Sequence, residues 1–213
     1  MKQRTNQVLF SYWNEVRAHR LAPRRFEIEP AQIAHILPET FILECIDQNC
    51  YRFRLAGTRI CEHFGREFRG SNFLDLWQDM DRLILTRQLG SMVDQGAVGI
   101  LSFELESVDG RRAGFEAVLL PLLHTQQTIT RFLGSMSAID PPAWLGTERV
   151  SRLRLLMHEL VWPDGRPHSI VRRMGATVPT VSPEEAGRLV QVDRRRFRVY
   201  EGGLSRLDSD PSE

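Results

Sequence analysis

The alternation of apolar and polar residues from position 101 to position 106 constrains the fold of this chain more than any other feature. The residues in this stretch are Leu101, Ser102, Phe103, Glu104, Leu105 and Glu106. Successive side chains of a β-strand point to opposite faces of a sheet, so a period of two predicts a strand with one dry face and one wet face. The chain is therefore expected to build a sheet that is covered on its dry side.

Four other segments have strand patterns, and helical patterns separate the first two strands from the last three. The strand segments are residues 41–46, 51–55, 115–122 and 131–139, and the helical ones are residues 60–64, 73–77 and 80–93. Asp109-Gly110 is a hairpin signal between strands of the last group. This order predicts an α+β fold, in which a five-stranded antiparallel sheet carries the short helices on one face.

An amphipathic helix is predicted before the first strand. Leu9, Tyr12, Trp13 and Val16 recur at the spacing of one helical face. This stripe has more apolar area than a free surface helix is expected to show. It either packs against its copy in a second protomer, in which case Trp13→Ala lowers the dimer content, or it folds back on its own sheet. The sequence leaves both alternatives open.

The chain after the last predicted strand forms a C-terminal extension. A helix is expected over residues 148–160, whose apolar side would hold Val150, Leu153, Leu156, Met157 and Leu160. Beyond residue 163 large apolar residues become rare, so the tail is expected to be loosely ordered. The predicted organisation is a helical N-terminal extension at residues 1–40, a core at residues 41–140 and a partly helical, partly irregular extension at residues 141–213.

Charge and composition argue against two kinds of partner. The net charge is +1, with 42% apolar and 26% charged residues, so neither a polyanion nor a membrane surface is expected to attract the chain. The first residues lack the apolar core of a signal peptide, and no apolar run is long enough to span a bilayer. The three cysteines, at positions 45, 50 and 61, offer no disulfide framework. These features predict a cytoplasmic protein.

A set of short motifs runs through the same segments in a fixed order. They include Tyr12-Trp13, Leu37-Pro38, Leu55-Ala56-Gly57-Thr58, Phe64-Gly65-Arg66-Glu67, Phe73 to Trp77, Leu133-Gly134 and Trp144-Leu145-Gly146. Together they resemble the PAS-fold family of bacterial single-domain regulatory proteins, over about residues 8–146. The resemblance implies a sensory or protein-interaction module that is often dimeric and brings no catalytic residues with it. Its expected partners are a second copy of the chain and signalling proteins such as histidine kinases.

A pocket of this fold would lie between the sheet and the short helices. From the alternation, its lining would consist of Phe53, Leu55, Ile60, Phe64, Trp77, Leu101, Phe103 and Leu105. Apolar linings of this kind are typical of small-molecule sites. The alternative is a fully packed core, and the number of large side chains competing for one small volume favours it.

No cofactor or metal is expected from the sequence. The helix predicted at residues 80–93 contains no histidine that could bind haem, and Cys61 lies outside the asparagine-cysteine-arginine motif of flavin photosensors. His158-Glu159 begins like a zinc-peptidase helix, but position 162 is tryptophan. Glu104, Glu106 and Glu116 alternate with apolar neighbours, so we expect them on a solvated sheet face rather than in acid–base roles.

One basic cluster lies near the C-terminus. It consists of Arg194, Arg195, Arg196 and Arg198. With Phe197 between its members it could bind nucleic acid, but acidic residues on both sides favour a solvated or partner-binding tail. The sequence therefore predicts a non-catalytic bacterial signalling protein that acts by protein–protein contact, with a small ligand in the cavity as an option. The alternatives are a small-ligand enzyme or carrier, and a nucleic-acid-binding regulator.

Overall fold

A single antiparallel sheet organises the chain in the computed structural model, which describes residues 1–124 and 128–165. In chain order the elements are α1 (Arg4–Arg17), the 3₁₀ helices η1 (Arg25–Glu27) and η2 (Pro30–Glu39), β1 (Thr40–Asp47), β2 (Cys50–Ala56), α2 (Thr58–Phe64), the 3₁₀ helix η3 (Phe73–Leu76), α3 (Asp79–Gln95), β3 (Val98–Ser107), β4 (Arg112–Leu123), β5 (Ile129–Ile139) and β6 (Val150–Val161). No helix in these ranges is both long and apolar enough to span a membrane.

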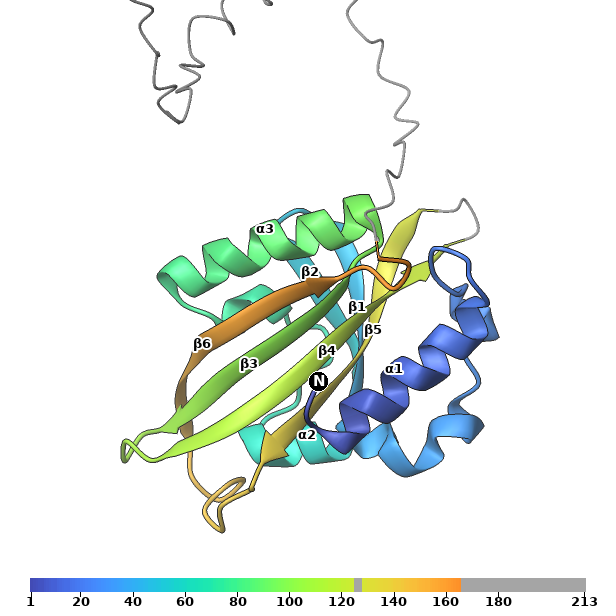
Figure 1. Cartoon of the computed structure of the whole chain (residues 1–213). Helices are drawn as coiled ribbons and strands as arrows, with labels where there is room; N and C mark the ends of the chain where they lie inside the picture. Colours follow the sequence, from blue (N-terminus) through green and yellow to red (C-terminus); the bar gives the residue numbers. More distant parts are fainter. Residues whose placement is uncertain (125–127, 166–213) are drawn as a thin grey trace, which may run out of the picture. The chain divides into compact units, whose positions relative to one another are not determined.

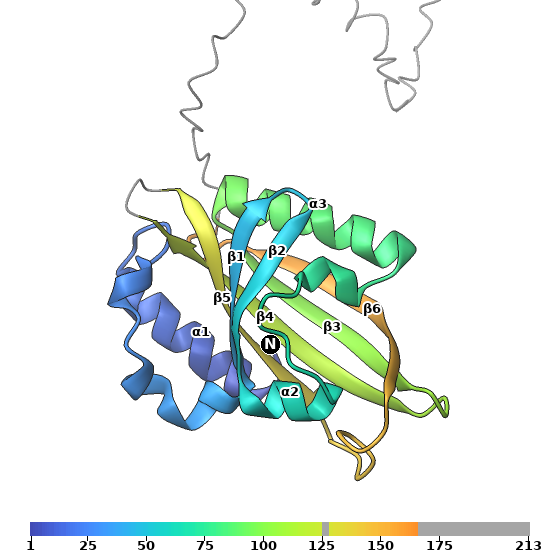
Figure 2. The same cartoon turned by 180° about the vertical axis from the view of Figure 1, so that it is seen from behind.

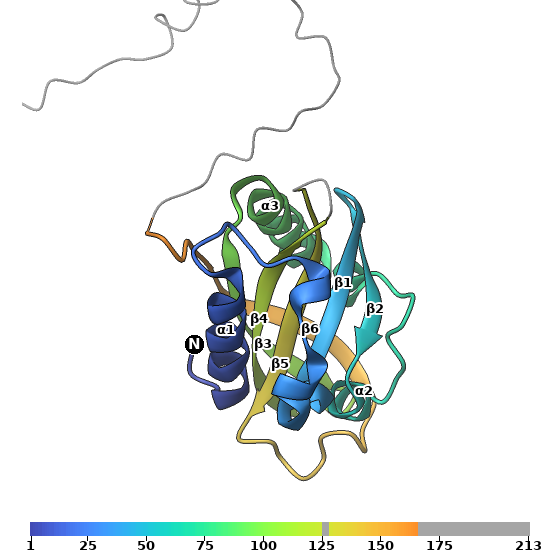
Figure 3. The same ribbon diagram turned by 90° about the vertical axis from the view of Figure 1, so that its right-hand side faces the viewer.

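The sheet order is β2-β1-β5-β4-β3-β6, and each neighbouring pair is antiparallel (Figure 1). The five strands predicted from periodicity are β1 to β5, so the predicted α+β class with an antiparallel sheet is confirmed. On the face called inner here, α2, η3 and α3 cover the sheet, as the helical pattern predicted (Figure 2). On the opposite, outer face lie α1 and η2 (Figure 3).

The predicted helix at residues 148–160 is wrong, because this segment is the strand β6, and the described sheet has six strands rather than five. β6 pairs with β3 along its whole length, from Val98 opposite Val161 to Ser107 opposite Val150. A register shift leaves Leu156 as an extra residue between the partners of Ser102 and Phe103. This bulge interrupts the alternation and brings apolar residues to helical spacing, which explains the error.

Helix α1 folds back on the sheet of its own chain, the second of the two alternatives that the sequence left open. Leu9 and Trp13 are fully buried and Tyr12 is 8% exposed, and all three pack with residues of β3, β4 and β5. The Trp13 indole Nε1 donates a hydrogen bond of 2.8 Å to the Pro121 carbonyl. Val16 packs at the edge of the same cluster. The stripe is therefore part of the core of one chain.

The end of α1 contacts the segment that follows β6. Arg17 is 4% exposed, and its guanidinium pairs with the Asp164 carboxylate at 2.8 Å. The same guanidinium also donates hydrogen bonds to the Asn14 side-chain oxygen and the Arg20 carbonyl, each at 2.8 Å. The helix at the start of the chain is thereby joined to the last described residues.

Candidate functional site

The inner face of the sheet carries most of the side chains that the sequence assigned to a ligand pocket. Seven of them belong to one buried cluster, and none is more than 5% exposed: Phe53, Ile60, Phe64, Trp77, Leu101, Phe103 and Leu105. β2, α2, the end of η3 and β3 supply these residues. The structure thus brings together residues that lie far apart in the sequence.

The space between these side chains is occupied by further aromatic rings. Phe68 lies 5.0 Å from Phe53 and 5.2 Å from Phe64, measured between ring centroids. Phe103 stacks on Phe115 at 5.3 Å and meets the edge of Trp77 at 5.2 Å. These are ordinary contact distances for aromatic pairs, so the cluster packs as a core. A flavin- or haem-sized group would fit only if several of these rings moved.

Leu55 does not join this cluster. It is 47% exposed and pairs with Ile42 on the outer face. The register between β1 and β2 shifts after Ile42, which leaves Arg54 as an extra residue. The period-two extrapolation from Phe53 to Leu55 therefore placed Leu55 on the inner face, whereas the bulge turns it outward.

Glu116 was expected on a solvated face but is buried, at 3% exposure, beneath the start of α1. Its carboxylate accepts hydrogen bonds from the backbone N–H groups of Lys2 and Gln3 and from the Asn6 side chain, at 2.8 to 2.9 Å. Burial alone would raise the pKa of Glu116, but hydrogen bonds from Gln3, Asn6 and Lys2 outweigh it and hold that pKa below its ordinary value.

Glu39, at the end of η2, is a second carboxylate engaged with α1. It accepts hydrogen bonds from the Thr5 hydroxyl at 2.5 Å and the Ser137 hydroxyl at 2.7 Å, and it pairs with Arg59 at 3.0 Å. Burial opposes ionisation here too, yet these three partners lower the pKa of Glu39. Both carboxylates stay ionised and fully engaged, so they fix the helix and are unsuited to acid–base catalysis.

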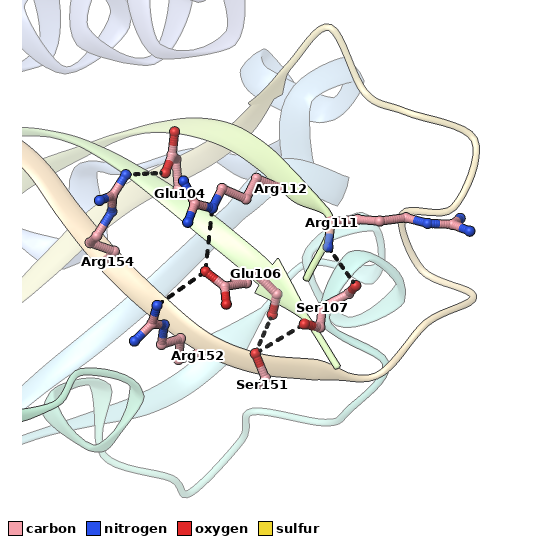
Figure 4. A network of polar contacts seen from close by, with 8 residues as sticks. All are labelled: Glu104, Glu106, Ser107, Arg111, Arg112, Ser151, Arg152 and Arg154. Atoms are coloured by element: carbon pink, nitrogen blue, oxygen red, sulfur yellow. Dashed lines mark hydrogen bonds and ion pairs between the residues drawn. The ribbon is translucent and has the colours of Figure 1, made fainter. Parts of the chain in front are cut away.

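The outer face beyond α1, over β3, β4 and β6, carries a ladder of ion pairs (Figure 4). Glu104 pairs with Arg154 at 2.6 Å, and Glu106 pairs with Arg152 at 3.2 Å and Arg112 at 3.3 Å. Met157, opposite Ser102 in the register, is 49% exposed beside this ladder. We call this surface the ladder face. It combines exposed charges with exposed apolar area.

An apolar groove of about 450 Å³ lies on the outer face at the other side of the sheet, between η2 and the ends of β1 and β2. Its lining includes Ile33, Leu37, Ile42, Leu55 and Leu133, with Arg25 at the rim. Sequence reasoning missed this groove because its wall, η2, is a 3₁₀ helix that packs on the sheet through Ile33 and Ile36 and comes into close backbone contact with the residue that follows β2. That contact is at Gly57, where a Cβ would lie 2.3 Å from the Pro38 carbonyl oxygen.

The cysteines offer little reactivity. Burial raises the pKa of Cys45 to about 12. Burial, together with the nearby Glu67, raises the pKa of Cys61. At Cys45 and Cys61 a thiol rather than a thiolate is therefore the form present at neutral pH. Within residues 1–124 and 128–165, no group of three His, Cys, Asp or Glu side chains could hold a metal ion. The basic cluster at Arg194, Arg195, Arg196 and Arg198 lies outside the described residues.

The fold is an α+β domain in which helices cover an antiparallel sheet. A family model described as "PAS domain" matches residues 1–137, and the chain belongs to this family. β6 lies beyond the matched residues. A comparison with curated proteins found no match.

Solved structures with a similar arrangement include light-oxygen-voltage (LOV) and PAS domains. The LOV protein of Rhodobacter sphaeroides is 12% identical, with a TM-score of 0.41, over 55% of this chain and 71% of that one. The Aureochrome1 LOV domain is 15% identical, with a TM-score of 0.37, over 53% and 89%. The PAS domain of an HTR-like protein from Haloarcula marismortui is 20% identical, with a TM-score of 0.36, over 54% and 95%.

Proposed function

We propose that this PAS protein is a non-catalytic, cytoplasmic regulator that acts by contact with other signalling proteins, of which histidine kinases are the expected class. Membership of the PAS family supports a signalling role. The observation that carries the rest is the aromatic packing of the inner cluster, in which Phe68 and Phe115 occupy the space between the predicted pocket residues. A domain whose interior is filled by its own side chains must transmit information through its surface.

Among residues 1–124 and 128–165, the buried charged side chains form no acid–base pair, and this supports a role without catalysis. The buried charged side chains of the described chain are Arg17 and Glu116. Both are engaged in fixing α1, and both lie on the outer face. An enzyme on this scaffold would need ionisable groups converging in a cleft, and neither Arg17 nor Glu116 faces the inner cluster.

The ladder face is the surface best suited to a protein partner. α1 and η2 cover much of the remaining outer face, whereas Glu104, Arg152 and Arg154 stay accessible beside the half-exposed Met157. Charged groups around an apolar centre favour selective association, because the charges set orientation and the apolar centre supplies affinity. A second copy of the chain would have the same chemistry available, so we include homodimerisation in the proposal.

The proposal is tested by measuring association with bacterial histidine kinases. The full chain and the variants Met157→Glu and Val108→Glu are used as bait, and bound kinases are identified by mass spectrometry and then tested as purified proteins. Val108 is 67% exposed in the β3–β4 hairpin, beyond the Glu106 end of the ladder and six positions along the chain from Ser102, the register partner of Met157, and serves as the matched control. We expect the native chain and Val108→Glu to retain the kinase and Met157→Glu to lose it.

Two results would contradict the proposal. One is equal kinase binding by all three proteins, which would remove the ladder face from the interaction. The other is a turnover of small-molecule substrates by the purified chain. Native mass spectrometry of the same samples reports the number of protomers and whether Met157→Glu changes it.

A further inference from the structure

A lateral row of apolar side chains crosses the outer face toward the β2 edge of the sheet. Leu133 of β5 stands opposite Ile42 of β1, and Ile42 stands opposite Leu55 of β2. Leu133 is covered, at 3% exposure, whereas Leu55 is 47% exposed. The apolar row therefore emerges from under the helices and ends in an open position, where most sheets place polar residues.

The helix η2 forms a wall beside this row and converts it into the groove of about 450 Å³. Ile33, Ala34 and Leu37 line the wall, and Ile28 lies at its start. Pockets of about 300–1,000 Å³ with mainly apolar linings are typical of small-molecule sites. Ile33 and Ile36 of η2 are buried in the same outer cluster as Leu133, which holds the wall against the sheet, so the groove is formed in advance of any ligand.

The charged residue at the rim gives the groove a chemical preference. Other arginines around it have carboxylate partners: Arg20 pairs with Glu27 at 2.9 Å, Arg54 with Glu44 at 3.0 Å and Arg59 with Glu39 at 3.0 Å. Arg25 lines the groove and forms no ion pair with any of the described residues. A guanidinium in this position favours a carboxylate, which it can bind through two parallel hydrogen bonds.

We propose that this groove binds a straight-chain alkyl carboxylate, a free fatty acid of medium length, with its tail on the row from Leu133 to Leu55 and its head on Arg25. This inference goes beyond the proposed function and does not depend on it, because the groove and the ladder face lie over different strands. It also places ligand binding on the outer face, whereas the pocket expected from the sequence would lie on the inner face. An apolar tail matches the lining, and one carboxylate matches the guanidinium of Arg25, the arginine that lines the groove.

The test is calorimetric titration of the full chain with sodium decanoate below its micelle concentration. 1-Decanol and decyltrimethylammonium share the tail but carry no charge or the opposite charge. We expect decanoate to bind at least tenfold more tightly than either. Arg25→Gln should weaken decanoate binding about tenfold, because it removes a charge-assisted pair, while Arg24→Gln, which changes an exposed neighbour stacked on Phe26, should leave it unchanged.

A variant that fills the groove with a larger side chain shows whether binding can be lost while the fold remains intact. Ala34 is exposed on η2, so Ala34→Phe should abolish decanoate binding without lowering the melting temperature. In methyl NMR spectra, decanoate should shift Ile42 and Leu55 and leave Leu101 and Leu105 of the inner cluster unchanged.

Three outcomes would overturn the proposal. They are equal affinity for decanoate and decyltrimethylammonium, unchanged affinity in Arg25→Gln, and shifts confined to the inner cluster. Binding to phosphatidylglycerol vesicles with no binding of free decanoate would overturn it as well, since the ligand would then be a membrane lipid.

Discussion

At the scale of single residues, the N-terminal helix is held by carboxylates that come from other elements. The N-cap of α1, Gln3, makes no side-chain capping bond, and the first turn contains no acidic residue. Glu116 of β4 supplies the missing group, because its carboxylate accepts the free N–H groups of Lys2 and Gln3 at the positive end of the helix. Capping across the chain in this way ties the start of α1 to the middle of the sheet.

The anchoring by Glu116 should depend on pH. The folded-state pKa of Glu116 lies below its ordinary value of 4.5, so its contribution to stability is present at neutral pH and is lost as the pH falls through the folded-state pKa. We expect Glu116→Gln to lower the free energy of unfolding by about 1–3 kcal/mol at pH 7 and to flatten its acid dependence. Urea unfolding at pH 7 and at acidic pH measures both. Glu104→Gln, in the exposed ladder, is the control and should change little; equal effects of both variants would contradict the assignment.

Gly57 is a residue at which any side chain would collide with the backbone at the end of η2. A methyl group there would lie 2.3 Å from the Pro38 carbonyl oxygen and 2.4 Å from that of Leu37, both of them backbone atoms. We expect Gly57→Ala to cost about 1–3 kcal/mol through overpacking and to open the groove beside η2. Gly90→Ala in α3 meets nothing within 4 Å and should stabilise the chain by up to about 1 kcal/mol. Thermal unfolding distinguishes the two variants, because the melting temperature should fall in Gly57→Ala and rise in Gly90→Ala. An unchanged melting temperature in Gly57→Ala would show that η2 is free to move.

At the scale of elements, α1 contributes Leu9, Tyr12 and Trp13 to the outer hydrophobic cluster. Trp13 is fully buried and its indole N–H is satisfied by Pro121. We expect Trp13→Ala to cost about 3–5 kcal/mol, as for other buried aromatic residues in cores. Chemical denaturation measures this loss, and analytical ultracentrifugation of the folded fraction shows whether the oligomeric state changes independently. A variant of native stability would mean that α1 detaches from the sheet in solution.

The edge strand β6 has a specific protection against pairing with other chains. The Asp81 carboxylate of α3 accepts the backbone N–H of Leu155 at 2.9 Å. Edge strands with free N–H groups promote aggregation, and an inward-reaching charge is a common safeguard. We expect Asp81→Ala to increase aggregation on heating, as measured by light scattering, whereas Asp75→Ala, which removes an exposed pair with Arg82 and a hydrogen bond from Asn72, should not. Equal aggregation of the two variants would argue against this role.

Strand patterns could be predicted from the sequence wherever the sheet is regular, and they failed at its bulges. The alternation from Leu101 to Glu106 identified β3 correctly because its partner β4 runs beside it without a register shift. The extra residues Arg54 and Leu156 break the period of two, so Leu55 was assigned to the wrong face and β6 to the wrong type of element. A bulge depends on the partner strand, and a single sequence does not identify that partner.

At the scale of the whole molecule, the sixth strand is expected to be required for folding even though the family match ends at residue 137. β6 covers the edge of β3, and Leu153 of β6 is buried in the inner cluster at 5% exposure. We expect a chain ending at residue 146 to lose its cooperative thermal transition and a chain of residues 1–165 to keep it. Near-ultraviolet circular dichroism of both chains during heating measures whether the cooperative transition is present. A shorter chain that folds normally would make β6 an accessory element.

The arrangement of α1 could not be predicted from the sequence for a related reason. The stripe of Leu9, Tyr12 and Trp13 is apolar whether it meets its own sheet or a second protomer. The choice depends on Glu116 and Ser135, which form the buried polar contacts with the first turns of α1. In the sequence these two residues look like ordinary members of alternating strands, and only the tertiary structure shows what they meet.

The pair between Arg17 and Asp164 gives the described chain a mechanical property. A strand at the edge of a sheet usually separates first when its end is pulled. Here, pulling the chain outward at Asp164 would break its ion pair with Arg17. The Arg17 guanidinium is 4% exposed and also lies over the Trp13 ring. Leaving such a charge buried and unpaired costs about 3–5 kcal/mol. A pulling force applied to the chain after β6 would therefore act on α1, through Arg17, before β6 separates from β3.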